Sequence, residues 1–195
     1  MNPCLWFNYN NDSSSQLLAV HLSRMLGQKK FKKMLKWGPP VFLCIGTPKI
    51  PGDCLGPMVG SLLSLADRYP VFGTMARPVH AQNIRTVRKY IRRKYPRSLI
   101  IVIDASIGSA GHSGFLTLKK GPLRPGLGLG KRLPPVGHIQ ITGVFEDLYG
   151  NSAQKQMIGY GLCICQSLFF LNTKLCIPSA IRNRLDQTAG NLPFF

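Results

Sequence analysis

The sequence predicts an α/β fold, a three-layer sandwich around a mainly parallel sheet. Two short, uniformly apolar runs, Val41–Gly46 and Ser98–Ala105, are flanked by turn residues, which is typical of strands buried on both faces. Stretches with helical periodicity separate these runs from each other and from weaker strand candidates. Strands that alternate with helices indicate parallel strands joined by crossover helices.

The N-terminal part predicts a polar lead followed by one helix. Residues 1–15 are rich in Asn and Ser, and we expect them to be poorly ordered. From Gln16 the apolar spacing predicts an amphipathic helix that runs on into the lysine-rich segment QKKFKKMLKW. The breakers Gly38–Pro40 end this helix before the first buried strand, 41–46.

The middle of the chain continues the alternation of strand and helix. The segment DCLGPMVGSLLSLADRY predicts a helix in which Gly56 and Gly60 allow close packing on the sheet. A weaker strand over Pro70–Met75 and a basic helix, HAQNIRTVRKYIRRKY, then lead into the buried strand 98–105.

The last third predicts two more strands and two helices. Residues Gly114–Gly121 alternate in polarity and predict an edge strand, and His138–Phe145 predict another strand after a long Gly/Pro loop. Helices are expected at about 152–171 and 178–189. No internal repeat is present, so the prediction is one domain over residues 16–195 behind the polar lead.

The apolar content and the net charge of the chain limit the classes of protein to which it can belong. Apolar residues make up 45% of the 195 residues, which excludes disorder for most of the chain. The 25 Lys and Arg against 7 Asp and Glu give a net charge of +18, which would attract nucleic acid or acidic proteins non-specifically. A basic solvated surface without a dedicated partner explains the same charge.

The apolar runs and the cysteines of the sequence predict where the protein is located and whether its thiols are reduced. The longest apolar run, Met157–Leu171, is shorter than the roughly 20 residues that cross a bilayer, and the N-terminus lacks the pattern of a signal peptide. Most of the six cysteines lie in apolar runs, and Cys163 and Cys165 are spaced wrongly for a zinc pair. We therefore expect a cytoplasmic protein with reduced thiols, no membrane contact and no metal.

Two acidic residues stand where the predicted strands end. Asp53 follows the first buried strand at a helix start, and Asp104 ends the second. Ligands collect beyond the carboxyl ends of strands in open α/β sheets, so neighbouring strands would bring both carboxylates to one crevice. Two close carboxylates share a proton, and a water between them would be a nucleophile for amide hydrolysis. The spacing alone is explained equally well by structural roles, with Asp53 as a helix N-cap and Asp104 as a turn residue after its strand.

Four blocks of the sequence carry a family resemblance. They are CIGTPKIPGDCLGPMVG (44–60), RPVHAQNI (77–84), LIIVIDASIG (99–108) and GPLRPGLGLGKRLPPVGHIQITG (121–143). In order and spacing, over about residues 17–189, the chain resembles the YyaC sporulation proteins of spore-forming bacteria. That family is similar to the germination protease of spores, and more distantly to the hydrogenase maturation proteases.

The resemblance implies the phosphorylase/hydrolase-like α/β sandwich of those peptidases and a peptide substrate, in particular small acid-soluble spore proteins. The DCLGP and VIDA segments match the catalytic aspartate motifs of the germination protease, so the resemblance assigns catalysis to Asp53 and Asp104. It also implies a location in the forespore or spore core.

The chain departs from the related patterns in two places. Pro48 and Lys49 stand where YyaC proteins usually carry Asp-Arg, which changes the mouth of the expected site. The matching loop has Arg124, and no histidine, where the maturation proteases bind nickel, so no metal and no other cofactor is implied.

The remaining candidates are weaker. The loop Gly126–Lys131 is not a Walker A motif, because its glycine spacing is wrong and Arg132 follows the lysine. Arg124, Gly128 and Lys131 in and beside this loop are candidates to bind a substrate carbonyl or carboxylate. His80 is the fourth substrate-binding candidate. A structural role, as a histidine at a helix start that packs on the sheet, would account for this residue equally well.

Two functions remain open from the sequence. The first is a spore peptidase in which the aspartate pair activates water, acting in sporulation or germination. The alternative is a non-catalytic basic spore protein that binds nucleic acid or acidic proteins. The oligomeric state is not indicated.

Overall fold

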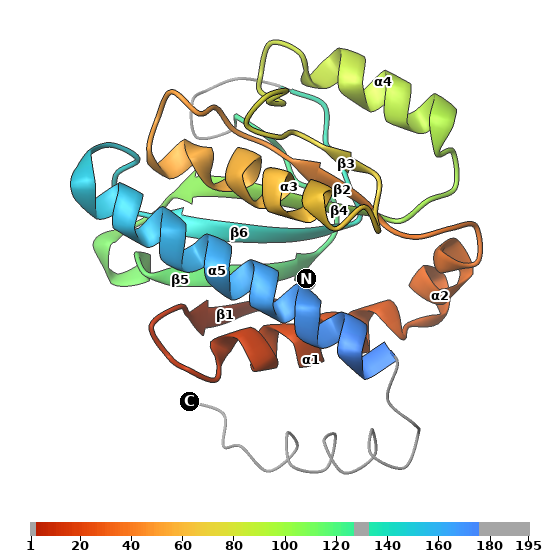
Figure 1. Ribbon diagram of the computed structural model, residues 1–195, viewed down its shortest axis with the longest axis horizontal. Helices are drawn as coiled ribbons and strands as arrows, with labels where there is room; N and C mark the ends of the chain where they lie inside the picture. Colours follow the sequence, from red (N-terminus) through yellow and green to blue (C-terminus); the bar gives the residue numbers. More distant parts are fainter. Residues whose placement is uncertain (1–2, 127–132, 176–195) are drawn as a thin grey trace.

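A six-stranded sheet organises the computed structural model, which describes residues 3–126 and 133–175 (Figure 1). The strands are β1 (Cys4–Asn8), β2 (Val41–Cys44), β3 (Val71–Phe72), β4 (Ile100–Ile107), β5 (Phe115–Lys120) and β6 (Ile139–Phe145). Their order across the sheet is β1-β5-β6-β4-β2-β3. Strands β3, β2, β4 and β6 are parallel, whereas β5 is antiparallel to both β6 and β1. The predicted α/β fold with a mainly parallel sheet is confirmed.

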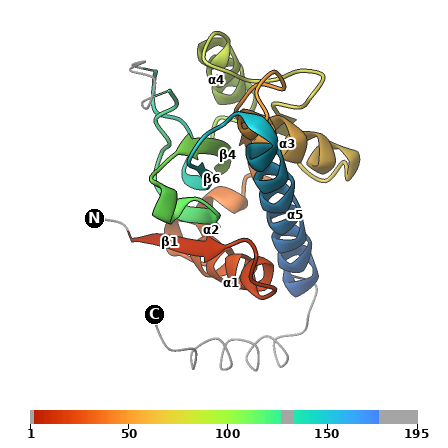
Figure 2. The same cartoon turned by 90° about the vertical axis from the view of Figure 1, so that its left-hand side faces the viewer.

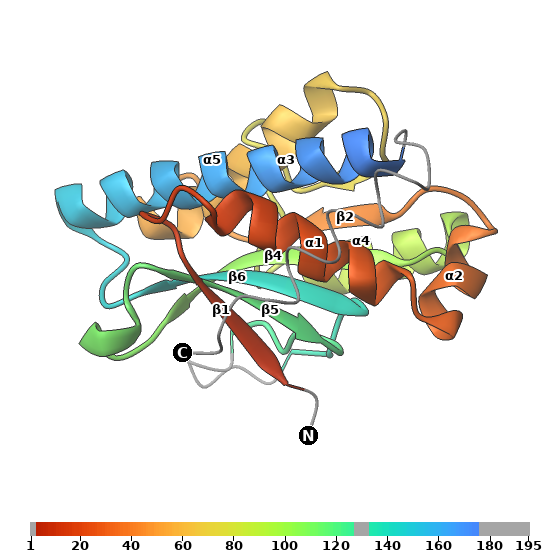
Figure 3. The same ribbon diagram turned by 90° about the horizontal axis from the view of Figure 1, so that it is seen from below.

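Helices cover both faces of this sheet and make three layers (Figures 2 and 3). They are α1 (Ser14–Leu26), α2 (Lys29–Leu35), η1 (Gly52–Cys54), α3 (Leu55–Leu65), α4 (Ile84–Lys94), η2 (Ala110–His112) and α5 (Gly150–Leu175). The larger core cluster lies between the sheet and α1, α3 and α5. The smaller cluster lies on the other face, under α4 and the chain around Leu123 and Val136.

Helix α5 buries one stripe of its surface and exposes the other. Met157, Tyr160, Ile164 and Leu168, spaced three or four residues apart, are all buried in the larger cluster. Leu162 and Phe169 point outward and are exposed. Within the described residues, no helix is both long enough and apolar enough to span a membrane.

The N-terminal segment differs from the prediction. Part of the expected poorly ordered lead forms β1, which pairs with β5 and buries Phe7. The asparagines that suggested disorder form the turn behind this strand, since Asn8 and Asn11 accept hydrogen bonds from the backbone N–H groups of Asn10 and Ser13. The prediction of β5 as an edge strand is therefore wrong, because β1 covers it.

Two other boundaries shift. The single helix predicted before the first buried strand is two helices, because the chain turns at Gly27 and Gln28 takes an extended conformation before α2. The closing helix predicted at about 178–189 lies outside the described residues. The five described cysteines, including buried Cys44 and Cys54, are free thiols.

Two glycines let α3 lie directly on the ends of β2 and β3, as predicted. A Cβ on Gly56 would stand 2.0 Å from the Ile45 carbonyl oxygen, and one on Gly60 would stand 1.9 Å from the Gly73 carbonyl oxygen. Both obstacles are backbone atoms, which cannot move aside as a flexible side chain would. The start of α3, and with it η1, is thereby fixed over the end of β2.

We expect Gly60→Ala to lower the free energy of unfolding by about 3 kcal/mol, because the new methyl group must displace the backbone at Gly73. Urea denaturation measures this loss. Gly111→Ala is the matched control, since a Cβ there meets no atom within 4 Å, and it should change stability by less than about 0.5 kcal/mol. Equal stability of the two variants would contradict the close contact between α3 and the sheet.

Candidate functional site: an aspartate pair at the end of β2

The sheet places Asp104 level with the end of β2. Strands β2 and β4 are parallel neighbours in which Cys44 lies opposite Ile103, and the Ile45 N–H donates to the Ile103 carbonyl at 2.8 Å. Asp104 is the next residue along β4 and lies opposite Thr142 of β6. Since side chains alternate along a strand, Asp104 shares the sheet face of Val102, which belongs to the core cluster under α4.

Asp53 reaches the same place by a loop that folds back on β2. The loop leaves β2 through Gly46, and a Cβ on this glycine would stand 1.9 Å from the carbonyl oxygen of Asp53. The Thr47 N–H donates to Asp53 Oδ2 at 2.8 Å. The Asp53 side chain therefore accepts a hydrogen bond from its own loop, and the N-cap position of the helix that follows is Cys54.

The segment after β6 fixes η1 from the other side. The Gly52 N–H donates to the Leu148 carbonyl at 2.8 Å, and a Cβ on Gly52 would meet the Leu148 side chain at 2.8 Å. The backbone on both sides of Asp53 is thus held, by Gly46 on one side and Leu148 on the other. An aspartate held in this way has little freedom to turn away from the sheet.

The electrostatics show that the two carboxyl groups interact. Burial raises the pKa of Asp104 well above its ordinary value, and the charge of Asp53 raises it further, against a smaller opposing effect of the Ala105 backbone. Burial also raises the pKa of Asp53, but the Thr47 N–H and the charge of His80 act in the opposite direction. Asp53 therefore loses its proton first, and Asp104 retains a proton beside the Asp53 carboxylate.

His80 lies at the same rim of the sheet. Val79 bridges to Ile45 in parallel, and the Gly46 N–H donates to the Val79 carbonyl at 2.8 Å. The His80 N–H donates to Asn83 Oδ1, and its carbonyl accepts from the first turn of α4, so His80 is also the helix-start residue that the sequence suggested. Its imidazole is close enough to lower the pKa of Asp53.

The other predicted residues are not joined to the pair by any described contact. Arg124 is exposed, one residue beyond the bridge between Leu123 and Val136. Among the described residues, no hydrogen bond or ion pair connects it to Asp53 or Asp104. Gly128 and Lys131 lie outside the described residues.

Two features of the site were not anticipated. The Thr47 backbone N–H holds Asp53, and no residue type in the sequence marks a main-chain donor. The second is the contact of buried Cys54, next to Asp53, with Met75, whose sulfur atom lies 3.4 Å from the Cys54 sulfur. In the described ranges, 3–126 and 133–175, no group of three or more His, Cys, Asp or Glu residues is arranged to hold a metal ion.

Comparison with known proteins identifies a family that matches this chain. The family model described as "Protein of unknown function (DUF1256)" matches residues 7–156. The chain belongs to this family. The DUF1256 match includes both aspartates and every described strand except the first residues of β1.

A curated relative supports the same placement. The DUF1256 chain is 39% identical over 108 residues to the uncharacterized protein YyaC of Bacillus subtilis (strain 168). The alignment covers 54% of this chain and 53% of YyaC, so the chain matches about half of that relative's length. The resemblance to YyaC proteins seen in the sequence is confirmed.

A solved structure is also similar to the chain. The [NiFe] hydrogenase maturation protease HybD from Thermococcus kodakarensis matches with 14% identity and a TM-score of 0.40, covering 67% of this chain and 99% of that protein.

The raised pKa values predict how stability depends on pH. Between the ordinary Asp pKa near 3.8 and the higher folded value, the folded protein keeps a proton on Asp104 that the unfolded chain has released. The stabilisation is complete below this window and is lost as the pH rises through the folded pKa. Asp104→Asn removes this loss, so its stability relative to wild type should increase as the pH rises from the ordinary Asp pKa through the folded pKa of Asp104.

Urea denaturation at a series of pH values measures this difference. Asp12→Asn, at an exposed position, controls for the change in charge and should stay within about 0.5 kcal/mol of wild type at every pH. If the difference between Asp104→Asn and wild type is the same at pH 4 and pH 8, the Asp104 carboxyl is not held protonated by burial and by Asp53.

Proposed function

We propose that the protein is a peptidase that hydrolyses peptide bonds with water activated by Asp53 and Asp104. The observation that carries the proposal is the half-buried Asp104 at the end of β2, whose pKa is raised by removal of its carboxyl from water and raised further by the charge of Asp53. One ionised and one protonated carboxyl side by side provide a general base and a general acid at the same place.

The proposed reaction begins with a water molecule between the two groups. The Asp53 carboxylate takes a proton from this water as its oxygen bonds to the carbonyl carbon of the peptide. Asp104 donates its proton to the carbonyl oxygen, giving a neutral tetrahedral diol. Asp104 then takes back a proton from the diol, Asp53 gives its proton to the amide nitrogen, and the C–N bond breaks. The products are a carboxylic acid and an amine, and both aspartates return to their starting states.

The surrounding groups support this division of roles. The Thr47 N–H at 2.8 Å and the charge of His80 both stabilise ionised Asp53, which is the group that must accept a proton first. Asp104 lies within a sheet strand, where burial stabilises its neutral form. His80 is therefore a positioning and electrostatic residue for Asp53 in this proposal. Arg124 and Lys131 remain proposed substrate-binding residues, as does the backbone at Gly128.

The substrate class comes from the resemblance seen in the sequence. The germination protease degrades small acid-soluble spore proteins, and its two aspartate motifs match those around Asp53 and Asp104. Membership of DUF1256 and the identity to YyaC support the family resemblance on which this substrate class depends. We therefore propose a spore protein of this kind as substrate, with action in the forespore or spore core during sporulation or germination.

A second candidate function follows from the charge on the outside of α4. Arg85, Lys89, Arg92 and Arg93 are exposed on this helix, and the whole chain carries +18. Close to the end of α4, the Arg97 guanidinium lies 4.2 Å from the ring centroid of Trp37, which is 57% exposed. In a complex with single-stranded nucleic acid, the basic side chains would bind the phosphates and the exposed indole would stack on an unpaired base. A non-catalytic nucleic-acid binder would use this surface and leave the aspartates without a role in chemistry.

Substitution of the aspartates separates the two candidates. Asp53→Asn and Asp104→Asn should each lower kcat for cleavage of a small acid-soluble spore protein by about 10²–10⁴-fold, because each removes one proton-transfer group. Cleavage is followed by mass spectrometry of the products. Asp12→Asn, with the same change in charge at an exposed position, should retain full activity.

The wild-type rate should fall at low pH, where Asp53 is protonated, and again at high pH, where Asp104 loses its proton. If no cleavage is detected with wild type, or if both Asn variants cleave as fast as wild type, the peptidase proposal fails. Binding of a DNA oligonucleotide that weakens steeply with salt and is unchanged in both variants would then favour the second candidate.

A further inference from the structure

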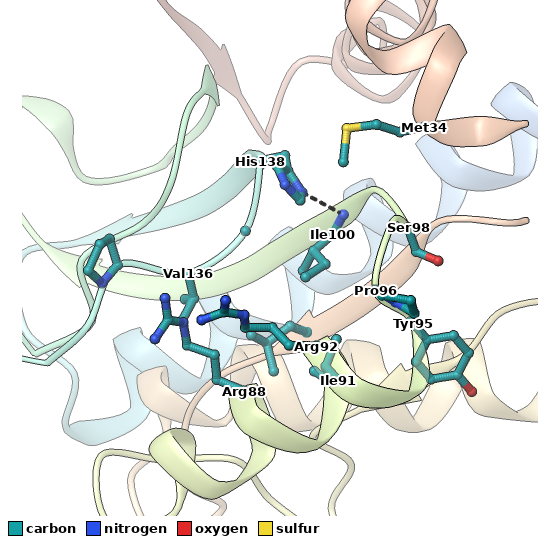
Figure 4. Close-up of a pocket in the computed structure, with 13 residues that line it drawn as sticks. Met34, Arg88, Ile91, Arg92, Tyr95, Pro96, Ser98, Ile100, Val136 and His138 are labelled. Atoms are coloured by element: carbon teal, nitrogen blue, oxygen red, sulfur yellow. Dashed lines mark hydrogen bonds between the residues drawn. The ribbon is translucent and has the colours of Figure 1, made fainter. Parts of the chain in front are cut away.

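A cavity lies away from the aspartate pair, at the amino ends of β4 and β6 (Figure 4). Its volume is about 260 Å³, just below the roughly 300 Å³ at which pockets for drug-sized ligands begin, so it suits a smaller molecule. Helix α4 forms one side with Arg88 and Arg92, and the chain before β6 forms another with Val136 and His138. Met34 of α2 closes the cavity near His138 (Figure 4).

The cavity is positively charged without a compensating acid. None of its thirteen lining residues, all of them within the described part of the chain, is acidic. Arg88 and Arg92 are four residues apart, so they lie one above the other on the same face of α4. Figure 4 shows both guanidinium groups reaching from the helix toward the strand. Two like charges held side by side repel each other unless an anion lies between them.

His138 adds a neutral donor to this charge. Its Nδ1 accepts a hydrogen bond from the Ile100 N–H at 3.0 Å, so the ring proton is on Nε2. Burial lowers the pKa of His138, and the charge of Lys30 lowers it further. The imidazole therefore remains a neutral hydrogen-bond donor, and Lys30 contributes another positive charge close to the cavity.

Apolar side chains form part of the remaining walls, beside Ser98 and Tyr95, which carry hydroxyl groups. Leu43, Ile91 and Val136 are all buried and belong to the core cluster under α4, and Ile100 packs against it. A ligand that fills the cavity therefore needs a small organic body as well as an anionic group. Arginine pairs bind phosphate oxygens in a bidentate manner, and a phosphate monoester carries the two negative charges that balance two guanidinium groups.

The cavity is distinct from the proposed peptidase site. Ile100, which lines it, precedes Asp104 by four residues on β4, which is about 13 Å at 3.3 Å per residue. The two sites therefore lie toward opposite ends of the same strand. We propose that this cavity is a binding site for a small phosphate monoester, with the phosphate on Arg88 and Arg92 and the organic part toward His138. This site does not depend on peptidase activity.

The test is calorimetric titration with ribose 5-phosphate as the probe, in phosphate-free buffer at constant ionic strength. Ribose is the matched neutral compound, inorganic phosphate represents the free anion, and a hexaglutamate peptide represents carboxylates. The Arg88→Gln/Arg92→Gln variant removes the two cavity charges. The Arg85→Gln/Lys89→Gln variant is the control, because it removes two charges from the same helix at positions that do not line the cavity.

We expect ribose 5-phosphate to bind wild type with a Kd below about 1 mM and ribose not to bind. The cavity variant should weaken binding at least about tenfold, and the control variant less than about twofold. Binding of inorganic phosphate with the same dependence on Arg88 and Arg92 also supports a phosphate site, with the free anion as its ligand. Thermal unfolding of both variants shows whether each is folded.

Three outcomes would overturn the proposal. The first is no binding of either phosphate compound to wild type. The second is equal weakening by the two variants, which means that the general charge of α4 attracts the probe. The third is binding of hexaglutamate, but not of either phosphate compound, in a manner that requires Arg88 and Arg92.

Discussion

The close backbone contact between Gly46 and Asp53 is the constraint on which the proposed site depends. A side chain at position 46 would collide with the Asp53 carbonyl oxygen, so glycine alone lets the loop after β2 fold back over the strand end. This fold-back also brings the Thr47 N–H to the Asp53 carboxylate. Without it, Asp53 would be an ordinary surface residue before a helix, with no path to Asp104.

The rest of the fold keeps this loop in place. Helix α3 lies on the sheet through Gly56 and Gly60, and the Leu148 segment after β6 holds Gly52 from the opposite side. Two contacts from different parts of the chain, Gly46 with Asp53 and Gly52 with Leu148, therefore act on a short 3₁₀ turn that leads directly into α3. Since each contact is between backbone atoms or against a glycine, the turn has no room to shift by even a methyl group. Such rigidity keeps two carboxyl groups close although burial and charge repulsion oppose it.

Much of the fold could be predicted because the buried strands have a strong signal. The runs at β2 and β4 are apolar on both faces, and the glycines of α3 indicated its contact with the sheet. The strand β1 could not be predicted, because its burial depends on pairing with β5, more than a hundred residues away. The short asparagine-rich turn after it resembles a disordered lead in composition alone.

The candidate site was partly predictable for a related reason. Asp53 and Asp104 are marked by their positions after apolar runs, and parallel strands bring such positions to one edge. The Thr47 donor is a main-chain group, so the sequence does not show it. The pocket at Arg88 and Arg92 was hidden for another reason. Those arginines look like part of a solvated helix face until the chain before β6 is seen to lie across from them.

The central claim is that Asp53 and Asp104 titrate as a pair, with the proton on Asp104. The most direct measurement is the pH titration of the ¹³C-labelled carboxyl carbons by NMR, in wild type and in the Asp53→Asn variant. We expect the pKa of Asp104 to lie above the ordinary range in wild type and to decrease when the Asp53 charge is removed. An Asp104 pKa that is ordinary, or that does not change in Asp53→Asn, would contradict the account.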